Sequence, residues 1–520
     1  MPSQAPAPAP TLTSHFTSSL PPSYHQQYAY EEEEYENSEQ LHSGYIEHSL
    51  NHSVVPFITT HQSGLVKHYL DHVLQRQYLL ADSSIAEFII RTVQQNPAVR
   101  DAVCLLASLH QESLRRGNSS TGQQNELVFH DEPSSDSNKA YKRICENLYT
   151  SAQEGYTEGE AMAGLFVVSA FLFRGGHGAW QHFLAVAADW VWNVLHTGVD
   201  PAETILRCSD SQQFVIKTTF WFDILASTTR LEPPRFIAVY RKLWQQGAYI
   251  EGGPSRSGPH QQSSPLSMMS VMGCENETAL AIAETSALAC WKVAQERQGK
   301  LSVPDLVDRG RIIEQECLSR ISPASMSMQP QPVPPGGVLY PAGGSGISDD
   351  LSAKRRLTAD IFRSTARVYL HSVISGEHPG CPEIRDGVRE TIECLRRVPV
   401  GGSSHGHGHG QGHGHGSGSV ARSVLRSVVF GICLCGCLAD DPDDREFLLR
   451  RLDAEEQAEG VGNCASARLV MQEVWRRRAP CIGGGGSGEC AESSSSAALP
   501  PPLSWREATQ QFGGESLLLV

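Results

Sequence analysis

Apolar residues recur at helical spacing along most of the chain after about residue 60. In the segment GLVKHYLDHVLQRQYLL, Leu65, Tyr69 and Val73 fall on one stripe of an amphipathic helix. In the segment NPAVRDAVCLLASLHQESLRR, Asn96 can cap a helix that has Pro97 at its first position. Runs of alternating β-branched residues are nearly absent. The pattern therefore predicts an all-α fold, built as one large multi-helix domain.

The same spacing predicts many further helices. We expect them at about residues 138–151, 157–173, 178–195, 211–227, 234–244, 276–298, 304–319, 351–375, 382–397, 420–438, 442–453 and 463–477. The sequence RGGHG, between the helices expected at 157–173 and 178–195, supplies glycines that can adopt left-handed backbone conformations. We expect this stretch to end one helix and turn the chain into the next.

Low-complexity segments flank and interrupt the helical pattern. Residues 1–60 are rich in Pro, Ser, Tyr, His and Glu, and we predict a disordered tail before a domain over residues 61–520. The acidic and aromatic stretch YAYEEEEYENSEQ in this tail resembles disordered activation segments in composition, although a solvated tail is the favoured interpretation. Loop insertions, long, disordered and exposed on the surface, are predicted at about residues 247–273, 322–349, 400–419 and 479–502.

Charge and cysteine usage narrow the class of protein. The chain has 42 Lys and Arg against 57 Asp and Glu, a net charge of -15, which repels the phosphates of nucleic acids. The N-terminus lacks the basic and apolar regions of a secretory signal. The longest apolar runs fall far short of the roughly 20 residues that span a bilayer, so no membrane association is expected. The 14 scattered cysteines are read as reduced thiols.

A histidine-rich segment, HGHGHGQGHGHG, offers imidazole nitrogens that suit zinc, copper or nickel. A glycine-rich chain loses much backbone freedom when it chelates a metal, and this segment falls inside the third predicted insertion. A tolerated insertion is therefore the favoured interpretation. The weak metal candidates are His405, His407, His409, His413 and His415.

Motifs for catalysis are lacking in the sequence. GGGGSG, at residues 483–488, has the glycine spacing of a dinucleotide loop, but no predicted strand precedes it and no helix follows it. The sequence contains no P-loop, H-E-x-x-H or C-x-x-C motif, so we expect neither an enzyme nor a cofactor site. For Cys433, Cys435 and Cys437, in an apolar run, burial is favoured over metal binding.

The segment FWFDILASTTRLEPPRF predicts a corner between two helices. Asp223 lies among large apolar residues, and its carboxylate needs a partner, for which Arg230 and Arg235 are the candidates. Pro233 and Pro234 end one helix and start the next. A buried ion pair that fixes the corner is favoured over a wall of an effector pocket. On that hypothesis Asp223→Ala destabilises the fold by about 3–5 kcal/mol.

Several blocks of the sequence resemble one known family, in the family's order. They include FLFRGGHGAWQHFLAVAADWV, WFDILASTTRLEPPRF, ARVYLHSVISGEHPGCPEIRDGVRETIECLRRVP, VVFGICLCGCLADDPDDREFLLRRL, VGNCASARLVMQEVWRRR and SWREATQQFGGESLLLV. Together, over about residues 60–520, they resemble the fungal-specific transcription factor domain, the regulatory region of fungal binuclear zinc-cluster regulators. The resemblance implies an all-helical domain that governs activity and lies C-terminal to a DNA-binding cluster.

In that family, DNA binding resides in a basic module in which six cysteines hold two zinc ions. Its cysteine spacing is absent from this chain, in which no two cysteines form a C-x-x-C pair. We therefore expect no direct DNA binding by this chain, and zinc only if a six-cysteine cluster lies upstream.

The resemblance predicts a transcriptional regulator of the nucleus, or the regulatory part of one, acting through effector or partner binding. The alternative is a helical scaffold or interaction protein with no transcriptional role. The expected partners are the transcription machinery or other regulators, and a small-molecule effector. A homodimer and a heterodimer both stay open.

Overall fold

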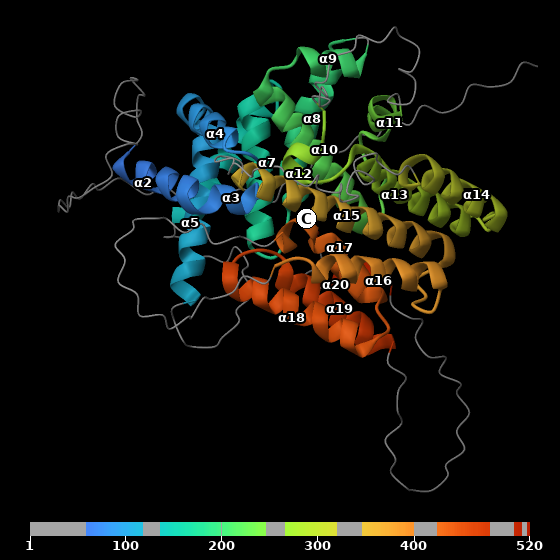
Figure 1. The fold of residues 1–520 in the computed structure, drawn as a ribbon. Helices are drawn as coiled ribbons and strands as arrows, with labels where there is room; N and C mark the ends of the chain where they lie inside the picture. The colour runs from blue at the N-terminus through green and yellow to red at the C-terminus, as the bar shows by residue number, and fades with distance from the viewer. Residues whose placement is uncertain are drawn as a thin grey trace, which may run out of the picture. The chain divides into compact units, whose positions relative to one another are not determined.

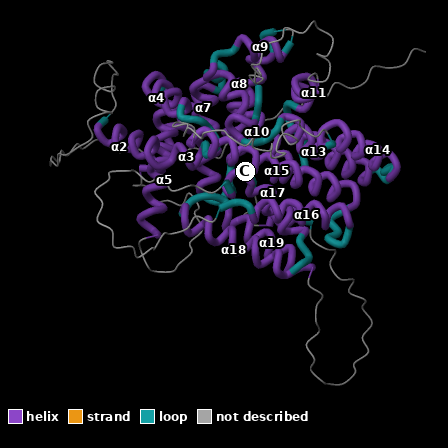
Figure 2. Tube along the Cα trace, in the orientation of Figure 1, coloured by secondary structure: helices purple, strands orange, loops and turns teal. Residues whose placement is uncertain are grey.

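The computed structural model describes residues 59–117, 136–198, 200–245, 266–319, 346–399, 424–478, 504–511 and 517–520. These residues all belong to one unit of the chain, residues 57–520. Within them every regular element is a helix and no strand occurs, which confirms the predicted all-α class (Figure 2).

The first third of the helical unit is built around α5 and α7, which pack against each other. Its elements, in chain order, are α2 (Thr60–His68), the π-helix η1 (Tyr69–Val73), α3 (Leu74–Gln77), α4 (Ser84–Gln95), α5 (Pro97–Gly117), α6 (Asp136–Ser151), α7 (Glu158–Phe173) and α8 (Trp180–Leu195). The single helix predicted for residues 64–80 is therefore three consecutive segments, and it ends at Gln77. A π-helical segment inside a helix often marks a functional position.

The middle third places α10 against α7, α8 and α13 (Figure 1). Its elements are α9 (Pro201–Arg207), α10 (Asp210–Arg230), α11 (Ile237–Gln245), α12 (Met269–Met272), α13 (Asn276–Arg297), α14 (Val303–Ile313) and the π-helix η3 (Glu314–Leu318). The predicted helix at 276–298 matches α13 closely, whereas the sequence pattern had not indicated α9 or α12.

The last third packs on the long helix α15, which contacts α13, α16 and α17. Its elements are α15 (Gly346–Ser375), α16 (Pro382–Arg396), the 3₁₀ helix η5 (Leu425–Val428), α17 (Val429–Leu438), α18 (Pro442–Glu459), α19 (Cys464–Arg478) and α20 (Trp505–Gln511). Every residue of α17 is buried, including Cys433, Cys435 and Cys437. Because all three side chains are fully buried among apolar residues, these cysteines behave as core residues, which confirms the packing interpretation. Burial also raises the pKa of the Cys435 thiol to about 12.

Side-chain caps fix several helix starts. The side-chain oxygen of Asn96 accepts a hydrogen bond from the backbone N–H of Val99 at 3.2 Å, as predicted. Thr157 and Glu160 form a reciprocal capping box at the start of α7. The large apolar side chains of the following turns are thereby presented to the core in a fixed register.

The glycine turn between α7 and α8 also receives the end of the sequence. Gly175, Gly176 and Gly178 have φ values of 105°, 83° and 110°, so the expected left-handed conformations are present. A Cβ atom on Gly176 would lie 2.6 Å from the carbonyl oxygen of Leu518. The backbone N–H of Leu518 donates to the Gly176 carbonyl at 2.9 Å, so a glycine at this position permits the close approach.

Residues 1–58 of the predicted N-terminal tail and the histidine segment lie outside the described residues, as do most of the four predicted insertions. The second insertion was predicted to reach residue 349, whereas α15 already begins at Gly346. The first insertion was predicted to reach residue 273, and this boundary is wrong. Leu266 and Met268 are only 7% and 1% exposed, and α12 follows directly. Isolated apolar side chains in a Ser- and Pro-rich stretch gave no periodic pattern, yet they anchor the chain to the core before α13.

Candidate functional site

The corner between α10 and α11 is present, and its carboxylate is bound by the turn itself. Asp223, which is partly buried, accepts hydrogen bonds from the backbone N–H groups of Arg235 at 3.0 Å and Phe236 at 3.2 Å. The hydroxyl of Tyr240 donates to the same carboxylate at 2.7 Å. Burial raises the pKa of Asp223, while these three donors act in the opposite direction. The carboxylate thus links α10 to the first turn of α11.

The predicted ion pair of Asp223 with Arg230 or Arg235 is wrong. The guanidinium of Arg230 instead pairs with Glu232 at 2.6 Å, and that of Arg235 pairs with Asp189 at 2.7 Å. The chain leaves α10 through Leu231, whose φ of 54° lies in the left-handed region. Pro233 and Pro234 follow this residue, and the turn that they shape presents backbone N–H groups, rather than a guanidinium, to the carboxylate.

A cleft opens next to this corner, between α13, the end of α15 and the segment that contains α20. Its volume is about 630 Å³, within the range of roughly 300–1,000 Å³ that small organic ligands occupy. Its apolar lining consists of Leu231, Ala289, Val293, Val373 and Pro379. Its charged lining consists of Lys292, Arg478 and Arg506, together with Glu296, Glu377 and Asp440.

Glu377, a residue of the cleft lining, joins separate parts of the chain. Its carboxylate accepts hydrogen bonds from the Ser504 hydroxyl at 2.7 Å and the backbone N–H of Trp505 at 2.9 Å, at the start of α20. The guanidinium groups of Arg478 and Arg506 lie 3.8 Å and 4.0 Å from the same carboxylate. One acidic side chain therefore connects the end of α15 with α19 and α20.

Arg506 extends this network back to the corner. Its Nε donates to the carbonyl of Thr228, near the end of α10, at 2.8 Å, and one Nη donates to the Tyr369 hydroxyl at 2.9 Å. Lys292, a lining residue from α13, donates to the Val373 carbonyl at 2.8 Å. The cleft is therefore bordered by polar groups whose positions are fixed by contacts to α10 and α15.

The local sequence pattern indicates the corner but not the cleft. Glu377, Arg478, Arg506 and Lys292 come from four segments far apart in the sequence, so no local spacing relates them. The available signal was the SGEHPG and SWREATQQ blocks, in which charged residues interrupt otherwise regular helical patterns.

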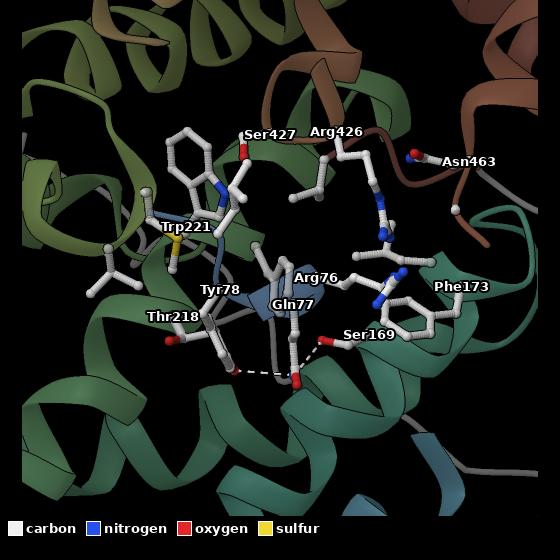
Figure 3. A pocket seen from close by; sticks show the side chains of 17 residues that line it. Arg76, Gln77, Tyr78, Ser169, Phe173, Thr218, Trp221, Arg426, Ser427 and Asn463 are labelled. Carbon is white, nitrogen blue, oxygen red and sulfur yellow. Dashed lines mark hydrogen bonds between the residues drawn. The ribbon is translucent and has the colours of Figure 1, made fainter. Parts of the chain in front are cut away.

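A second, smaller cavity of about 80 Å³ lies between the N-terminal, middle and C-terminal helices (Figure 3). Tyr78, Phe173 and Trp221 provide aromatic walls, and the guanidinium groups of Arg76 and Arg426 lie beside each other at one side. This cavity is too small for the ligands that the cleft can accommodate.

The described part of the chain contains neither a metal-binding cluster nor a helix that could span a membrane. Within it, no three His, Cys, Asp or Glu side chains are placed to bind one metal ion. The candidates His405, His407, His409, His413 and His415 fall outside it, so their metal binding stays a prediction. None of the described helices combines the length and the unbroken apolar character needed to cross a bilayer.

Comparison with known proteins gives the family. A family model described as "Fungal specific transcription factor domain" matches residues 64–519. No solved structure matches this chain.

Similar curated proteins include the trichothecene biosynthesis transcription regulator TRI10 of Trichoderma arundinaceum, 25% identical over 42% of this chain and 40% of that protein. The ustiloxin B cluster transcription factor ustR of Aspergillus flavus is 23% identical over 49% of this chain and 36% of its own length. The transcription factor dibT of Pestalotiopsis microspora is 26% identical over 51% of this chain and 37% of its own length. The matches thus span about two-fifths of these relatives, while the family model covers nearly all described residues, and the chain belongs to the fungal-specific transcription factor domain family.

Proposed function

We propose that this chain is a nuclear transcriptional regulator, or the regulatory part of one, and that it acts by binding a small-molecule effector. The family and the names of its relatives support a role in transcription. The relatives are regulators of biosynthesis or of a gene cluster by their printed names, and we extend only the regulatory role to this chain. Other regulators or the transcription machinery are the proposed protein partners.

The observation that carries the effector proposal is the cleft at Glu377. It combines a volume suited to a small organic molecule with apolar side chains and both signs of charge, which together provide affinity and orientation. The balance of three basic and three acidic residues favours an uncharged or zwitterionic ligand with several hydrogen-bonding groups. Such a ligand would contact Leu231 at the corner and the Glu377 network at the same time.

At this position a bound ligand can influence the packing of several helices. Because Glu377 and Arg506 connect α10, α15, α19 and α20, a ligand that shifts either side chain changes how these helices are held. An effector alters activity only if it binds two arrangements of the domain with different affinity. We propose that the ligand-bound and ligand-free arrangements differ in the surface that they offer to partner proteins.

The regulatory role is tested by deleting the gene and by following a fluorescent fusion of the chain. We expect nuclear fluorescence and altered transcript levels for a set of genes in the deletion strain. A fusion confined to the cytosol, with unchanged transcripts after deletion, would instead support the helical scaffold.

The cleft is tested by filling it. Val293→Trp adds a large ring from α13 into the cleft without removing a hydrogen bond, whereas Val307→Trp makes the same change on α14, where Val307 is 45% exposed. We expect the first variant, but not the second, to reproduce the transcript changes of the deletion strain, while both retain a native melting temperature. If both variants regulate like the native protein, the cleft is not the effector site.

A further inference from the structure

The smaller cavity shown in Figure 3 has a composition of its own. It is lined by residues from α3, α7, α10 and η5 and from the turn before α19. Two of its lining residues, Arg76 and Arg426, are cationic, and none of its described lining residues is Asp or Glu. A cavity with two guanidinium groups at its edge and no acidic side chain among its described lining residues attracts an anion.

The two arginines are held at this position by their surroundings. The guanidinium of Arg76 donates to the backbone carbonyl of His72, and that of Arg426 lies over the Phe173 ring, 5.2 Å from its centre. Gly462 has a φ of 125°, and a Cβ atom there would lie 3.4 Å from two nitrogens of Arg426. Both arginines also make further contacts within the protein. Val520 lies in the same lining.

Two buried polar atoms at this region lack hydrogen-bond partners. The hydroxyl of Thr218, a cavity-lining residue that is 1% exposed, makes no hydrogen bond. The Nε2 atom of His110, a neighbouring residue that is 2% exposed and does not line the cavity, makes none either, while its Nδ1 lies 2.9 Å from the Nε2 of His68. A buried polar group without a partner is costly, and such groups mark places where a ligand or water binds.

The electrostatic potential at His110 is positive, like that at the edge of the cavity. Burial, reinforced by the charges of Arg76, His68, His72 and Arg426, lowers the pKa of His110 to about 3. The fields of both cavity arginines therefore reach this imidazole.

A metal ion does not explain the same residues. The rings of His68, His72 and His110 are neighbours, with centroid distances of 4.8 Å, 5.1 Å and 6.4 Å. The adjacent guanidinium groups repel a cation, and within the described chain no such trio is placed to bind one. The region suits negative charge.

The size of the cavity selects the class of anion. Its volume of about 80 Å³ is smaller than the ~150 Å³ cavity that accepts benzene, so aromatic acids and nucleotides do not fit. A guanidinium group presents a planar fork of donors that matches the oxygen atoms of phosphate and related oxyanions. A small tetrahedral oxyanion meets both requirements.

We propose that this cavity is a binding site for a small inorganic oxyanion, phosphate or sulfate, held by the guanidinium groups of Arg76 and Arg426. The anion contacts segments from the first and last thirds of the helical unit, so its binding stabilises their association. The site is separate from the cleft at Glu377, and the proposal does not depend on the effector role of that cleft.

The test is a calorimetric titration of the 520-residue chain with potassium phosphate and, separately, with potassium sulfate, at constant ionic strength set by potassium chloride. We expect saturable binding of one anion per chain and a rise in melting temperature as the anion concentration exceeds its Kd. The two titrations show which oxyanion the cavity prefers. Absence of saturable binding of both anions would overturn the proposal.

A pair of variants locates the bound anion. Arg426→Lys keeps the charge but loses the donor fork, and we expect it to weaken anion binding by roughly 10- to 100-fold, the range for loss of a charge-assisted hydrogen bond. Arg451→Lys is the matched control, because Arg451 is 7% exposed, donates to the Val398 carbonyl at 2.7 Å, and does not line the cavity. Native-like binding by Arg426→Lys would contradict the assignment.

If Arg426→Lys does not fold, a measurement on the native chain shows whether the anion binds in this cavity. In imidazole-selective NMR, the His110 signals should shift saturably with phosphate or sulfate, because an anion beside Arg76 and Arg426 changes the field at that ring. Equal ionic strength of chloride should leave the signals in place. Signals that respond identically to all three salts would rule out the site.

Discussion

Burial shifts the pKa values of two ionisable side chains of this domain, Asp223 and His110, in opposite directions. Burial is the largest influence on both, and it raises the pKa of Asp223 while it lowers that of His110. In each case the neutral form gains relative to the charged form. Their partners differ, however: Asp223 has three hydrogen-bond donors, whereas His110 has a single hydrogen-bonded neighbour, His68.

The two side chains show two outcomes for a polar group inside a fold: its hydrogen bonds are either all made within the protein or left partly unmade. The corner surrounds the Asp223 carboxylate with donors from a turn that two prolines help to shape, so the polar group is part of the architecture. The His110 region surrounds an imidazole with cations and leaves one ring nitrogen without a partner. The first arrangement is complete in the protein alone, and the second is open to an added ligand.

The largest effect is expected from Asp223→Ala. This change leaves the backbone N–H groups of Arg235 and Phe236 and the Tyr240 hydroxyl without their acceptor, at a cost of about 2–4 kcal/mol in the free energy of unfolding. Urea unfolding monitored by circular dichroism measures it. Asp189→Ala is the control, because it removes only the partially exposed partner of Arg235, and should cost less than about 1 kcal/mol. Equal costs for the two variants would contradict the assigned role of Asp223.

The next effect is the acid sensitivity caused by His110. Its folded-state pKa lies below the unfolded value of about 6.5, so its contribution to stability is complete above that pH and is lost as the pH falls toward 3. Between pH 7 and pH 5 the loss is about 2 kcal/mol by this linkage. Unfolding of the native chain and of His110→Gln at both values, in chloride buffer, measures it. The stability difference between the two proteins should shrink by that amount at pH 5, and a constant difference would refute the prediction.

Asp223 should show a pH dependence of the opposite sign. Because its folded-state pKa is raised, the folded state holds the proton more tightly, and its contribution to stability falls as the pH rises through the folded pKa. Asp223→Asn does not titrate at this position and is therefore the reference. The stability of the native chain relative to this variant should decrease from pH 4 upward. An increase over the same interval would mean that the donors outweigh burial.

Local sequence patterns were sufficient for most of the fold. The helices α13 and α16 lie within a residue or two of their predicted ranges, since long periodic segments with clear ends carry their own signal. The seven-residue helices α9 and α20 were missed because about two turns give too few apolar repeats to recognise. The cleft was missed for another reason: Glu377 meets Trp505 and Arg478 only through tertiary packing, which no local spacing encodes.

The corner shows the same limit within one motif. The sequence correctly placed Asp223 near the core and the prolines at the helix break. It assigned the partner wrongly because Arg230 follows at a spacing of seven residues, which in an ideal helix puts both side chains on one face. The turn at Leu231 brings backbone donors closer to the carboxylate than either guanidinium, and backbone direction in a turn is not readable from residue types.

The smallest expected effect tests that correction directly. Arg230 pairs with Glu232, and the two side chains are 32% and 59% exposed, so this ion pair contributes little to stability. We expect Arg230→Met, which retains apolar packing of the side-chain stem, to change the free energy of unfolding by less than about 1 kcal/mol. The same urea unfolding assay measures it beside Asp223→Ala. A loss of several kcal/mol, comparable with that of Asp223→Ala, would restore Arg230 as the buried partner of the corner carboxylate.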